Sequence, residues 1–401
     1  MRILVITNLF PPHAVGGYEL SCHDTVERWR EAGHDVAVLT TTTTFHDPVT
    51  DPPEPDVHRV LEWYWANHHI TRPARQERYR IERANQQRLD EVLSTFAPDV
   101  VSVWAMGGMS MGLLTTCIER ALPMVVVIED DWLVYAVHVD AWTAAWARRP
   151  KRLAALARRL TGLPTGVPVL PDMTTVAFAS DYLRQRAVAE ASIGFKRSEI
   201  VPLGTDPADF PSRRPGDRPW QGRLLMVGRV EPRKGFDIAI RALVDLPDDV
   251  TLRIVGTGDD RHRSELIAMA RELGVADRLG FDGFVARHHL AAVYAESDAL
   301  LFLSRWDEPF GLVPLEAMTQ AVPVVAIRRG GAAEFLTDGL NCVEVPVDDP
   351  AAVSSAVRTL AADEGLRRRL VNAGLTTGAA YRVDRFASEL EALHIAAVGR
   401  H

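Results

Sequence analysis

The sequence contains few cysteines. Its 401 residues include only three, Cys22, Cys117 and Cys342, which lie far apart and belong to no CxxC pair or His–Cys cluster with metal-ligand spacing. This odd number and wide spacing exclude a disulfide framework and a structural zinc site. We expect three buried or reduced thiols, and therefore a reducing compartment.

Long apolar runs are also absent. A membrane-spanning helix needs roughly 18 to 20 consecutive apolar residues, whereas a run such as residues 122–128 is short and contains a proline. At the N-terminus the apolar residues 3–6 are followed by Thr7 and Asn8, which is typical of a first strand and not of a signal peptide. We therefore expect a soluble, cytoplasmic protein.

An excess of positive charge is lacking as well. The chain has 45 basic and 53 acidic residues, for a formal net charge of -8. A nucleic-acid partner is disfavoured, because proteins that bind nucleic acids usually carry an excess of Lys and Arg. The hydrophobic content of 47% with 27 Gly and 25 Pro is that of an ordinary globular protein, and the length suggests two or three domains.

Short Val, Ile and Leu runs alternate with longer segments of helical spacing. This pattern predicts an α/β fold with buried parallel strands and crossover helices. Strands are expected at residues 3–7, 36–40, 100–103, 125–128 and 175–179, and then at 224–227, 252–255, 299–303 and 322–327. Helices are expected at residues 18–32 and 236–244. Because the layout restarts in the second half, we predict two doubly wound units.

The boundary between the units is expected at a polar, proline-rich stretch. Residues 202–207 and 211–219 contain the turn-forming residues of a linker. We predict a first domain over residues 1–205, a linker over 206–222 and a second domain over 223–380.

In doubly wound sheets, ligands bind beyond the carboxyl ends of the strands. After the first strand, Gly16 and Gly17 directly precede a helix, and such glycines let backbone amides approach an anion. After the strand at 224–227 come Gly228, Arg229 and Lys234, whose cations would suit a diphosphate. Each loop taken alone is equally consistent with a flexible turn or a solvated basic loop.

The segment 299–318 gives the strongest signal. A buried strand leads into a loop with Glu308, the chain turns at Gly311, and a helix follows with Glu316 about one turn inside it. Two carboxylates are thereby held near one helix N-terminus. A later loop again places glycines and an acid, Gly330-Gly331 and Glu334, after a strand.

These motifs resemble the retaining glycosyltransferases of family 4, which have the GT-B fold of two Rossmann-like domains facing across a cleft. The resemblance covers most of the chain. It is carried by Gly228-Arg229 with Lys234-Gly235, by Glu308-Pro309-Phe310-Gly311-Leu312 followed by Glu316, by Gly330-Gly331 with Glu334, and in the first half by Gly16-Gly17-Tyr18-Glu19 and Gly33-His34-Asp35-Val36.

The resemblance implies roles for these residues. Arg229 and Lys234 would hold the diphosphate of a nucleotide-sugar donor, Glu316 would bind the ribose hydroxyls, and Glu308 would face the donor sugar. Fixed cations and helix amides lower the barrier to departure of a nucleoside diphosphate, which gains negative charge as it leaves. The resemblance also implies that residues 381–398 form a helix that packs back on the first domain.

No cofactor is expected, and no metal. The pairs Asp130-Asp131 and Asp259-Asp260 are not the spaced Asp-x-Asp of metal-dependent glycosyltransferases, and enzymes of the resembled family generally work without a metal.

One position departs from the family pattern. Many members carry a His after the strand at 125–128, whereas this chain has Glu129-Asp130-Asp131-Trp132. An ionised carboxylate accepts but cannot donate a hydrogen bond. Asp130 or Glu129 could therefore contact sugar hydroxyls or the acceptor, and the structural alternative is a carboxylate that caps a nearby helix.

Together these arguments give a set of candidate residues. The expected catalytic residues are Glu308, Arg229, Lys234 and Asp130, and the expected donor-binding residues are Gly16, Gly17, Gly228, Phe310, Gly311, Leu312, Glu316 and Glu334.

Two segments have the composition of acceptor or partner surfaces. Residues 132–160 combine four aromatic residues with six later cations, and residues 71–88 contain six Arg against two Glu. A basic amphipathic helix can lie on anionic lipid, and the alternative is a solvated helix with a packed aromatic side.

We therefore predict a glycosyltransferase that moves a sugar from a nucleotide-sugar, with UDP- or GDP-sugars expected, to a small-molecule, saccharide or lipid-linked acceptor. A GT-B-fold sugar-nucleotide epimerase and a non-catalytic nucleotide-sugar-binding scaffold are the alternatives. The sequence leaves open the base, the sugar, the acceptor and the oligomeric state.

Overall fold

The computed structural model describes residues 1–44, 54, 56–66, 69–213 and 219–400. Two compact units account for the chain. The first comprises Met1–Pro202 and Phe386–His401, and the second comprises Leu203–Arg385. The described residues of the expected linker, 206–213 and 219–222, belong to the second unit.

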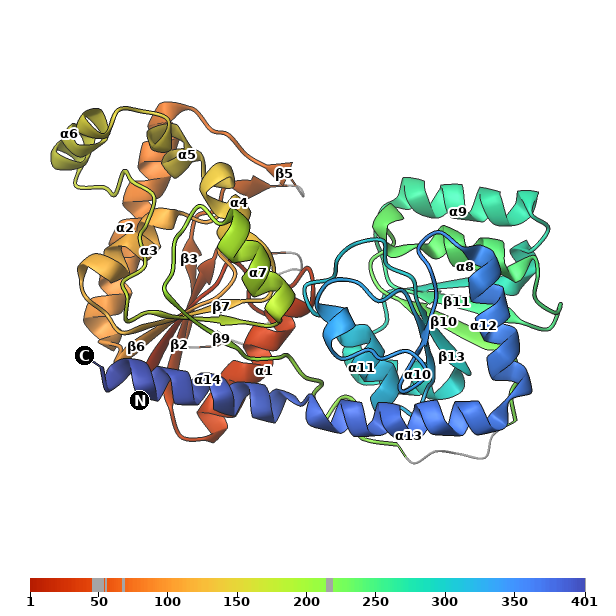
Figure 1. The fold of residues 1–401 in the computed structure, drawn as a ribbon. Coiled ribbons are helices and arrows are strands. Elements are labelled where there is room, and N and C mark those ends of the chain that lie inside the picture. The colour runs from red at the N-terminus through yellow and green to blue at the C-terminus, as the bar shows by residue number, and fades with distance from the viewer. Residues whose placement is uncertain (45–53, 55, 67–68, 214–218, 401) are drawn as a thin grey trace. The chain divides into compact units, whose positions relative to one another are not determined.

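The first unit contains a seven-stranded parallel sheet with the strand order β3-β2-β1-β6-β7-β8-β9 (Figure 1). Its strands are β1 (Arg2–Ile6), β2 (Asp35–Thr41), β3 (Val57–Leu61), β6 (Val100–Val103), β7 (Met124–Ile128), β8 (Thr175–Phe178) and β9 (Arg197–Ile200), with a separate hairpin of β4 (Trp65–Ala66) and β5 (His69–Ile70). Its helices are α1 (Gly17–Glu31), α2 (Arg75–Phe96), α3 (Met111–Glu119), α4 (Trp132–Val139), α5 (Ala141–Ala147), α6 (Lys151–Thr161) and α7 (Asp181–Glu190).

The second unit contains a six-stranded parallel sheet with the order β12-β11-β10-β13-β14-β15. Its strands are β10 (Arg223–Val227), β11 (Thr251–Val255), β12 (Leu279–Gly283), β13 (Ala299–Phe302), β14 (Val324–Ala326) and β15 (Val343–Glu344). Its helices are α8 (Phe236–Leu243), α9 (Asp260–Glu272), α10 (Arg287–Glu296), α11 (Leu312–Thr319), α12 (Pro350–Ala362) and α13 (Glu364–Ala380), with the short 3-10 helices η1 (Pro232–Lys234), η2 (Ala276–Arg278) and η3 (Gly330–Glu334).

The predicted α/β class with two doubly wound units is confirmed. The central strands are continuous apolar runs because helices cover both faces of each sheet, so both sets of side chains are buried. Ile3 to Ile6, for example, are at most 1% exposed, and β1 pairs with β2 on one side and β6 on the other. All three cysteines are free and buried, as expected.

The last helix, α14 (Val383–Val398), returns to the first unit from Phe386 onward. The Trp29 indole of α1 donates to the Ala387 carbonyl at 3.0 Å, and its ring meets the His394 ring edge-on at 4.9 Å. Phe386 packs edge-on against Trp104 at 6.2 Å. The C-terminal helix thus completes the core of a unit that begins at residue 1.

A buried polar cluster joins α2, α3 and the start of α5 inside the first unit. The Tyr64 hydroxyl donates to Glu82 Oε1 at 2.7 Å, and the Ser110 hydroxyl donates to Oε2. The Asp140 carboxylate accepts from the Met111 amide at 2.9 Å. Burial raises the pKa of Glu82 to about 8, and the nearby charge of Asp140 contributes in the same direction. Glu82 is therefore an acid that the fold keeps largely neutral at pH 7.

Candidate functional site

Two loops that follow neighbouring strands of the second sheet lie side by side. β10 pairs with β13, so the loop after β10, with Gly228, Arg229 and Lys234, meets the loop after β13, with Glu308. The Lys234 Nζ lies 2.5 Å from Glu308 Oε1, and the two side chains are 22% and 11% exposed. Two predicted residues that are 74 positions apart in the sequence thus form a largely buried ion pair.

Ser304 contacts the same oxygen of this carboxylate as Lys234 does. Its hydroxyl donates to Glu308 Oε1 at 2.8 Å and accepts from the Trp306 amide at 3.2 Å. With a hydroxyl and an ammonium group both directed at it, Glu308 is held as an acceptor in one defined orientation.

Two further cations surround a second carboxylate in the loop after β10. Arg229 Nε lies 3.0 Å from Glu231 Oε1, and Arg233 Nε lies 2.6 Å from Glu231 Oε2. The Arg233 guanidinium also stacks over the Trp306 ring at 5.2 Å. Together with Lys234 and Glu308 this makes three cations against two carboxylates, and the Arg229 side chain is 46% exposed. The loop therefore offers positive charge that an anion can reach.

Arg305 clamps these two loops together. Its guanidinium makes a bidentate pair with Asp237 at the start of α8, at 2.7 and 2.8 Å. It also donates to the Pro232 carbonyl at 3.0 Å, while the Arg305 amide donates to the Arg233 carbonyl at 2.8 Å. A planar guanidinium suits this paired geometry better than an ammonium does. The clamp fixes the distance between the basic loop and the loop that carries Glu308.

Two glycines permit close backbone approach at the same place. Gly235 has φ +74°, and a Cβ there would lie 2.1 Å from the Leu303 carbonyl oxygen. Gly330 has φ +58°, and a Cβ there would lie 2.4 Å from the Glu308 carbonyl oxygen. Because the collisions are with backbone atoms, no rotamer change relieves them. The predicted turn at Gly330-Gly331 thus packs against the backbone of Glu308, and the Gly331 amide donates to the Glu308 carbonyl at 2.7 Å.

Glu316 lies on α11, one turn inside the helix. Gly311 adopts φ +93° directly before Leu312, the first helical residue, so the first amides of the helix lack intrahelical partners. The Tyr294 hydroxyl on α10 donates to Glu316 Oε2 at 2.6 Å. Burial raises the pKa of Glu316, while the Tyr294 hydrogen bond and the charge of Arg287 lower it. Tyr294 holds one carboxylate oxygen and leaves the other for a further partner.

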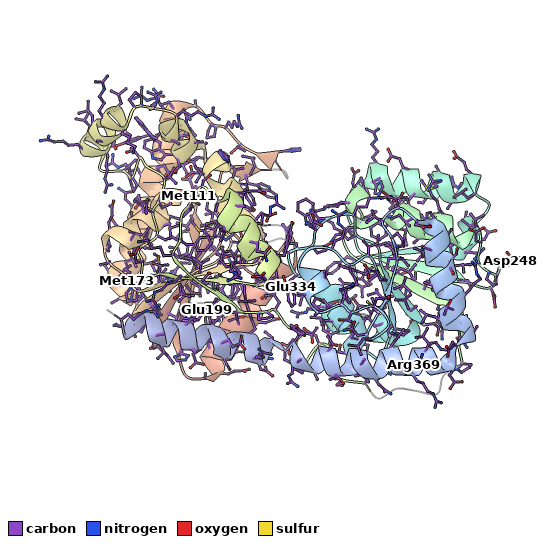
Figure 2. All side chains as sticks on the ribbon, viewed as in Figure 1. Met111, Met173, Glu199, Asp248, Glu334 and Arg369 are labelled. Atoms are coloured by element: carbon purple, nitrogen blue, oxygen red, sulfur yellow. The ribbon has the colours of Figure 1, made fainter. Side chains whose placement is uncertain are left out.

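Two other predicted donor-binding residues have different surroundings. The Phe310 ring is buried against Phe335 and Tyr381, at 5.3 and 5.8 Å between ring centroids, so its side chain anchors the loop. Glu334 ends η3 and is exposed (Figure 2).

The remaining predicted residues lie in the first unit, at the carboxyl ends of β1 and β7. Gly16 precedes α1 and Gly17 is its first residue. The Gly16 amide donates to Glu19 Oε2 at 2.8 Å, so an anion at this helix end would compete with Glu19. The Tyr18 hydroxyl donates to the Val127 carbonyl at 2.6 Å, which ties the glycine loop to the end of β7.

Asp130 follows β7 and is a hydrogen-bond acceptor on both oxygens. Oδ1 accepts from the Trp132 amide at 2.9 Å, and Oδ2 accepts from the Tyr135 hydroxyl at 2.7 Å. The first contact satisfies the first amide of α4, whose N-cap residue is Asp131, so Asp130 supports the start of this helix without being its N-cap residue. Burial raises the pKa of Asp130 to about 6, against the lowering effect of both hydrogen bonds.

Glu129 is more deeply placed than Asp130. Its Oε1 accepts from the Ser21 hydroxyl at 2.8 Å. Burial raises the pKa of Glu129, and the charges of Glu19 and Asp130 act in the same direction. A pair of acidic residues with hydroxyl neighbours therefore stands where the family pattern has a histidine.

Three residues that matter to this geometry, Tyr294, Ser304 and Arg305, were not selected from the sequence. No sequence motif marks Tyr294, because it lies in a helical segment 22 residues before its partner Glu316. Ser304 and Arg305 lie inside the segment 299–318 but carry no motif of their own.

Among the described residues, no group of three or more His, Cys, Asp or Glu is placed to hold a metal ion. Within the same residues, no helix is both long and apolar enough to cross a membrane.

Comparison with protein families matches both halves of the chain. Residues 15–209 match the family described as Glycosyltransferase Family 4, and residues 213–376 match the family described as Glycosyl transferases group 1.

Individual relatives agree with these matches. The chain is 31% identical to the lipopolysaccharide core biosynthesis glycosyltransferase LpsE of Rhizobium meliloti, over 58% of this chain and 69% of that protein. It is 35% identical to a D-inositol 3-phosphate glycosyltransferase of Xylanimonas cellulosilytica, over 43% of this chain. The alignment spans 45% of the length of that second relative.

Solved structures extend the likeness to the whole fold. HepE of Anabaena in complex with UDP-glucose matches with a TM-score of 0.69 at 19% sequence identity, over 98% of each chain. The two Rossmann-like sheets are therefore those of the GT-B fold, and the chain belongs to glycosyltransferase family 4, in the glycosyl transferases group 1.

Proposed function

We propose that this glycosyltransferase transfers a sugar from a nucleotide-sugar to an acceptor hydroxyl, with retention of the anomeric configuration and without a metal ion. The observation that carries the proposal is the contact between Lys234 and Glu308 at the carboxyl ends of β10 and β13. It joins a cation suited to a diphosphate with a carboxylate suited to sugar hydroxyls.

The basic loop supplies the electrostatic part of the reaction. As the sugar–phosphate bond breaks, negative charge grows on the leaving diphosphate. Arg229 and Lys234 stabilise that charge, and the free amides at the start of α11 add to it. Arg229 grips phosphate oxygens through parallel hydrogen bonds, whereas Lys234 acts as a point charge.

The two glutamates divide the recognition of the donor. Glu316 accepts hydrogen bonds from the ribose hydroxyls through the oxygen that Tyr294 leaves open. Glu308 accepts from hydroxyls of the sugar, while its contact with Lys234 links sugar binding to diphosphate binding.

Donor and acceptor classes follow from the same chemistry. A ribose-binding glutamate and a diphosphate-binding loop suit UDP- or GDP-sugars, and a relative of the same fold is known with UDP-glucose bound. The first unit receives the acceptor, where Asp130 accepts a hydrogen bond or the proton of the attacking hydroxyl. Small-molecule, saccharide and lipid-linked acceptors all carry such a hydroxyl.

Donor binding is tested first by a thermal-shift screen of UDP-, GDP-, ADP- and TDP-sugars. A ligand that binds only the folded state raises the melting temperature by mass action. A shift with one nucleotide identifies the donor, and absence of a shift with all of them argues against an intact donor site.

Kinetics of single variants then test the roles. Lys234→Ala and Glu308→Gln are expected to lower kcat by about 100-fold or more, as expected when a group that stabilises transition-state charge is lost. Glu316→Ala should mainly raise the donor KM. Arg261→Ala and Glu265→Gln, which alter an exposed ion pair on α9, are the matched controls. Wild-type kinetics in all three site variants would refute the assignment.

Product analysis separates this function from its rivals. Retention is read from the anomeric proton coupling of the product. Conversion of the donor without an acceptor would identify an epimerase, and donor binding without turnover over a broad acceptor panel would identify a scaffold.

A further inference from the structure

Helix α6 in the first unit presents apolar side chains to solvent. None of its residues is buried. Leu153, Leu156 and Leu160 are 46%, 52% and 77% exposed. Their spacing of three and four residues places them on one side of the helix. Figure 2 shows side chains of this helix projecting outward at the margin of the unit.

The same helix concentrates positive charge. Residues 148–161 contain six Lys or Arg and no acidic residue, in a chain with a formal net charge of -8. Arg158 pairs with Glu119, whereas Lys151, Arg152 and Arg159 are exposed and form no ion pair with a described residue.

Two of the cations lie beside the leucines, along one edge of the apolar side. Arg152 lies four residues before Leu156 and Arg159 lies three residues after it, so both are neighbours of the leucine side on the helix surface. Their long side chains can place charge at the level of phosphate groups while the leucines lie deeper.

The helix is held firmly in this orientation. The Thr165 hydroxyl donates to the Ala154 carbonyl at 2.8 Å, and the half-buried residues Ala154 and Ala157 face the body of the unit. Just before and after α6, Trp142 and Leu163 are part of one buried cluster, and the Trp142 indole donates to the Pro164 carbonyl at 2.6 Å. The apolar side is therefore presented by a fixed element.

We propose that α6, with Arg148 and Arg149 before it, docks on an anionic lipid bilayer, with the leucines in the headgroup region and the cations against lipid phosphates. Charge complementarity favours an anionic bilayer, because an amphipathic basic helix binds such a membrane through its buried apolar side chains and through electrostatic attraction together. Nucleic acid would engage the cations but not the leucines. The docking does not depend on the transferase reaction, since α6 contains none of the residues assigned to donor or acceptor.

Vesicle co-sedimentation of the full chain tests the proposal. One set of vesicles is phosphatidylcholine alone, and the other is equal parts phosphatidylcholine and phosphatidylglycerol. The protein is expected in the pellet with the anionic vesicles only. Added salt should release part of it, because the electrostatic contribution is screened.

Two sets of substitutions separate the contributions. Replacing Arg152 and Arg159 by Gln should lower the partition coefficient by about 25-fold, since each basic residue near an anionic surface contributes about fivefold. Leu153→Gln, Leu156→Gln and Leu160→Gln together should lower it by about tenfold or more.

The control variant is Val188→Gln with Lys196→Gln, which alters an exposed apolar residue and an exposed cation elsewhere in the same unit. An unchanged melting temperature and unchanged nucleotide binding show that each variant is folded.

Several results would overturn the proposal. These are equal pelleting with both kinds of vesicle, no pelleting with anionic vesicles at low salt, or full binding by the leucine variant. Salt-dependent binding to DNA or RNA that ignores the leucine substitutions would assign the surface to nucleic acid. Loss of self-association in the leucine variant, measured by sedimentation velocity without vesicles, would assign it to a second copy of the chain.

Discussion

Glu82→Gln gives a direct test of the buried polar cluster in the first unit. The pKa of Glu82 is raised from an ordinary value of 4.5 to about 8 in the folded protein. Between those values the folded state keeps a proton that the unfolded state loses. The stability associated with this group is therefore fully present below pH 4.5 and declines as the pH rises toward 8.

The magnitude follows from the proton difference. Each pH unit in this window changes the free energy of unfolding by about 1.4 kcal/mol per proton, so the range from pH 5 to pH 7 corresponds to about 3 kcal/mol. Glutamine keeps the shape and the acceptor, offers an N–H where the neutral acid offers an O–H, and does not titrate. The free energy of unfolding of the variant relative to wild type should thus increase by about 3 kcal/mol between pH 5 and pH 7.

Urea unfolding followed by tryptophan fluorescence measures this difference. Seven of the nine tryptophans lie in residues 1–202, so the signal reports mainly on the first unit. Glu199→Gln, at an exposed glutamate of the same unit, is the control and should show no such trend. A difference between Glu82→Gln and wild type that stays constant from pH 5 to pH 7 would refute a raised pKa at Glu82.

Three further outcomes are expected. Because the pKa of Asp130 is raised to about 6, the rise of kcat/KM with pH should be centred near pH 6 and should be lost in Asp130→Asn. An unchanged pH profile in Asp130→Asn would show that Asp130 is not the group whose ionisation controls kcat/KM. Arg305→Lys cannot keep the bidentate contact with Asp237 and should raise the donor KM several-fold. Steady-state kinetics at a fixed acceptor concentration measure this, and an unchanged donor KM would show that the contact does not affect donor binding. Activity in excess EDTA should equal that of the untreated enzyme, and loss of activity that Mg²⁺ or Mn²⁺ restores would contradict metal-independent transfer.

The central strands were predictable and the edge strands were not. β7 is a continuous apolar run, and β1 and β10 are apolar after their first residue, because both faces of these strands are covered. β9 (Arg197–Ile200) and β12 (Leu279–Gly283) lie at sheet edges with part of their surface in solvent, so their sequences carry no such run. An edge strand is defined by its neighbour more than by its own residues.

The site was predictable only in part. The rule that ligands bind beyond the strand ends directed attention to the loops with Lys234 and Glu308. Tyr294, Ser304 and Arg305 could not be selected in this way, because their contribution is a contact with a residue elsewhere in the chain. Asp130 was identified as unusual, but its contacts with Trp132 and Tyr135 depend on the geometry of α4.

The return of the chain to its first unit has a consequence for synthesis on the ribosome. The partners of Trp29 and Trp104 in α14 are made only after residues 203–385 have been translated. At about 5–20 residues per second this takes on the order of 10–40 s. During that time the nascent first unit has an open apolar surface beside α1, and the second unit is translated in full before α14 covers that surface. The first unit is thus finished after the second has been translated, and a nonsense mutation within residues 203–385 would remove α14 and damage the structure formed by residues 1–202.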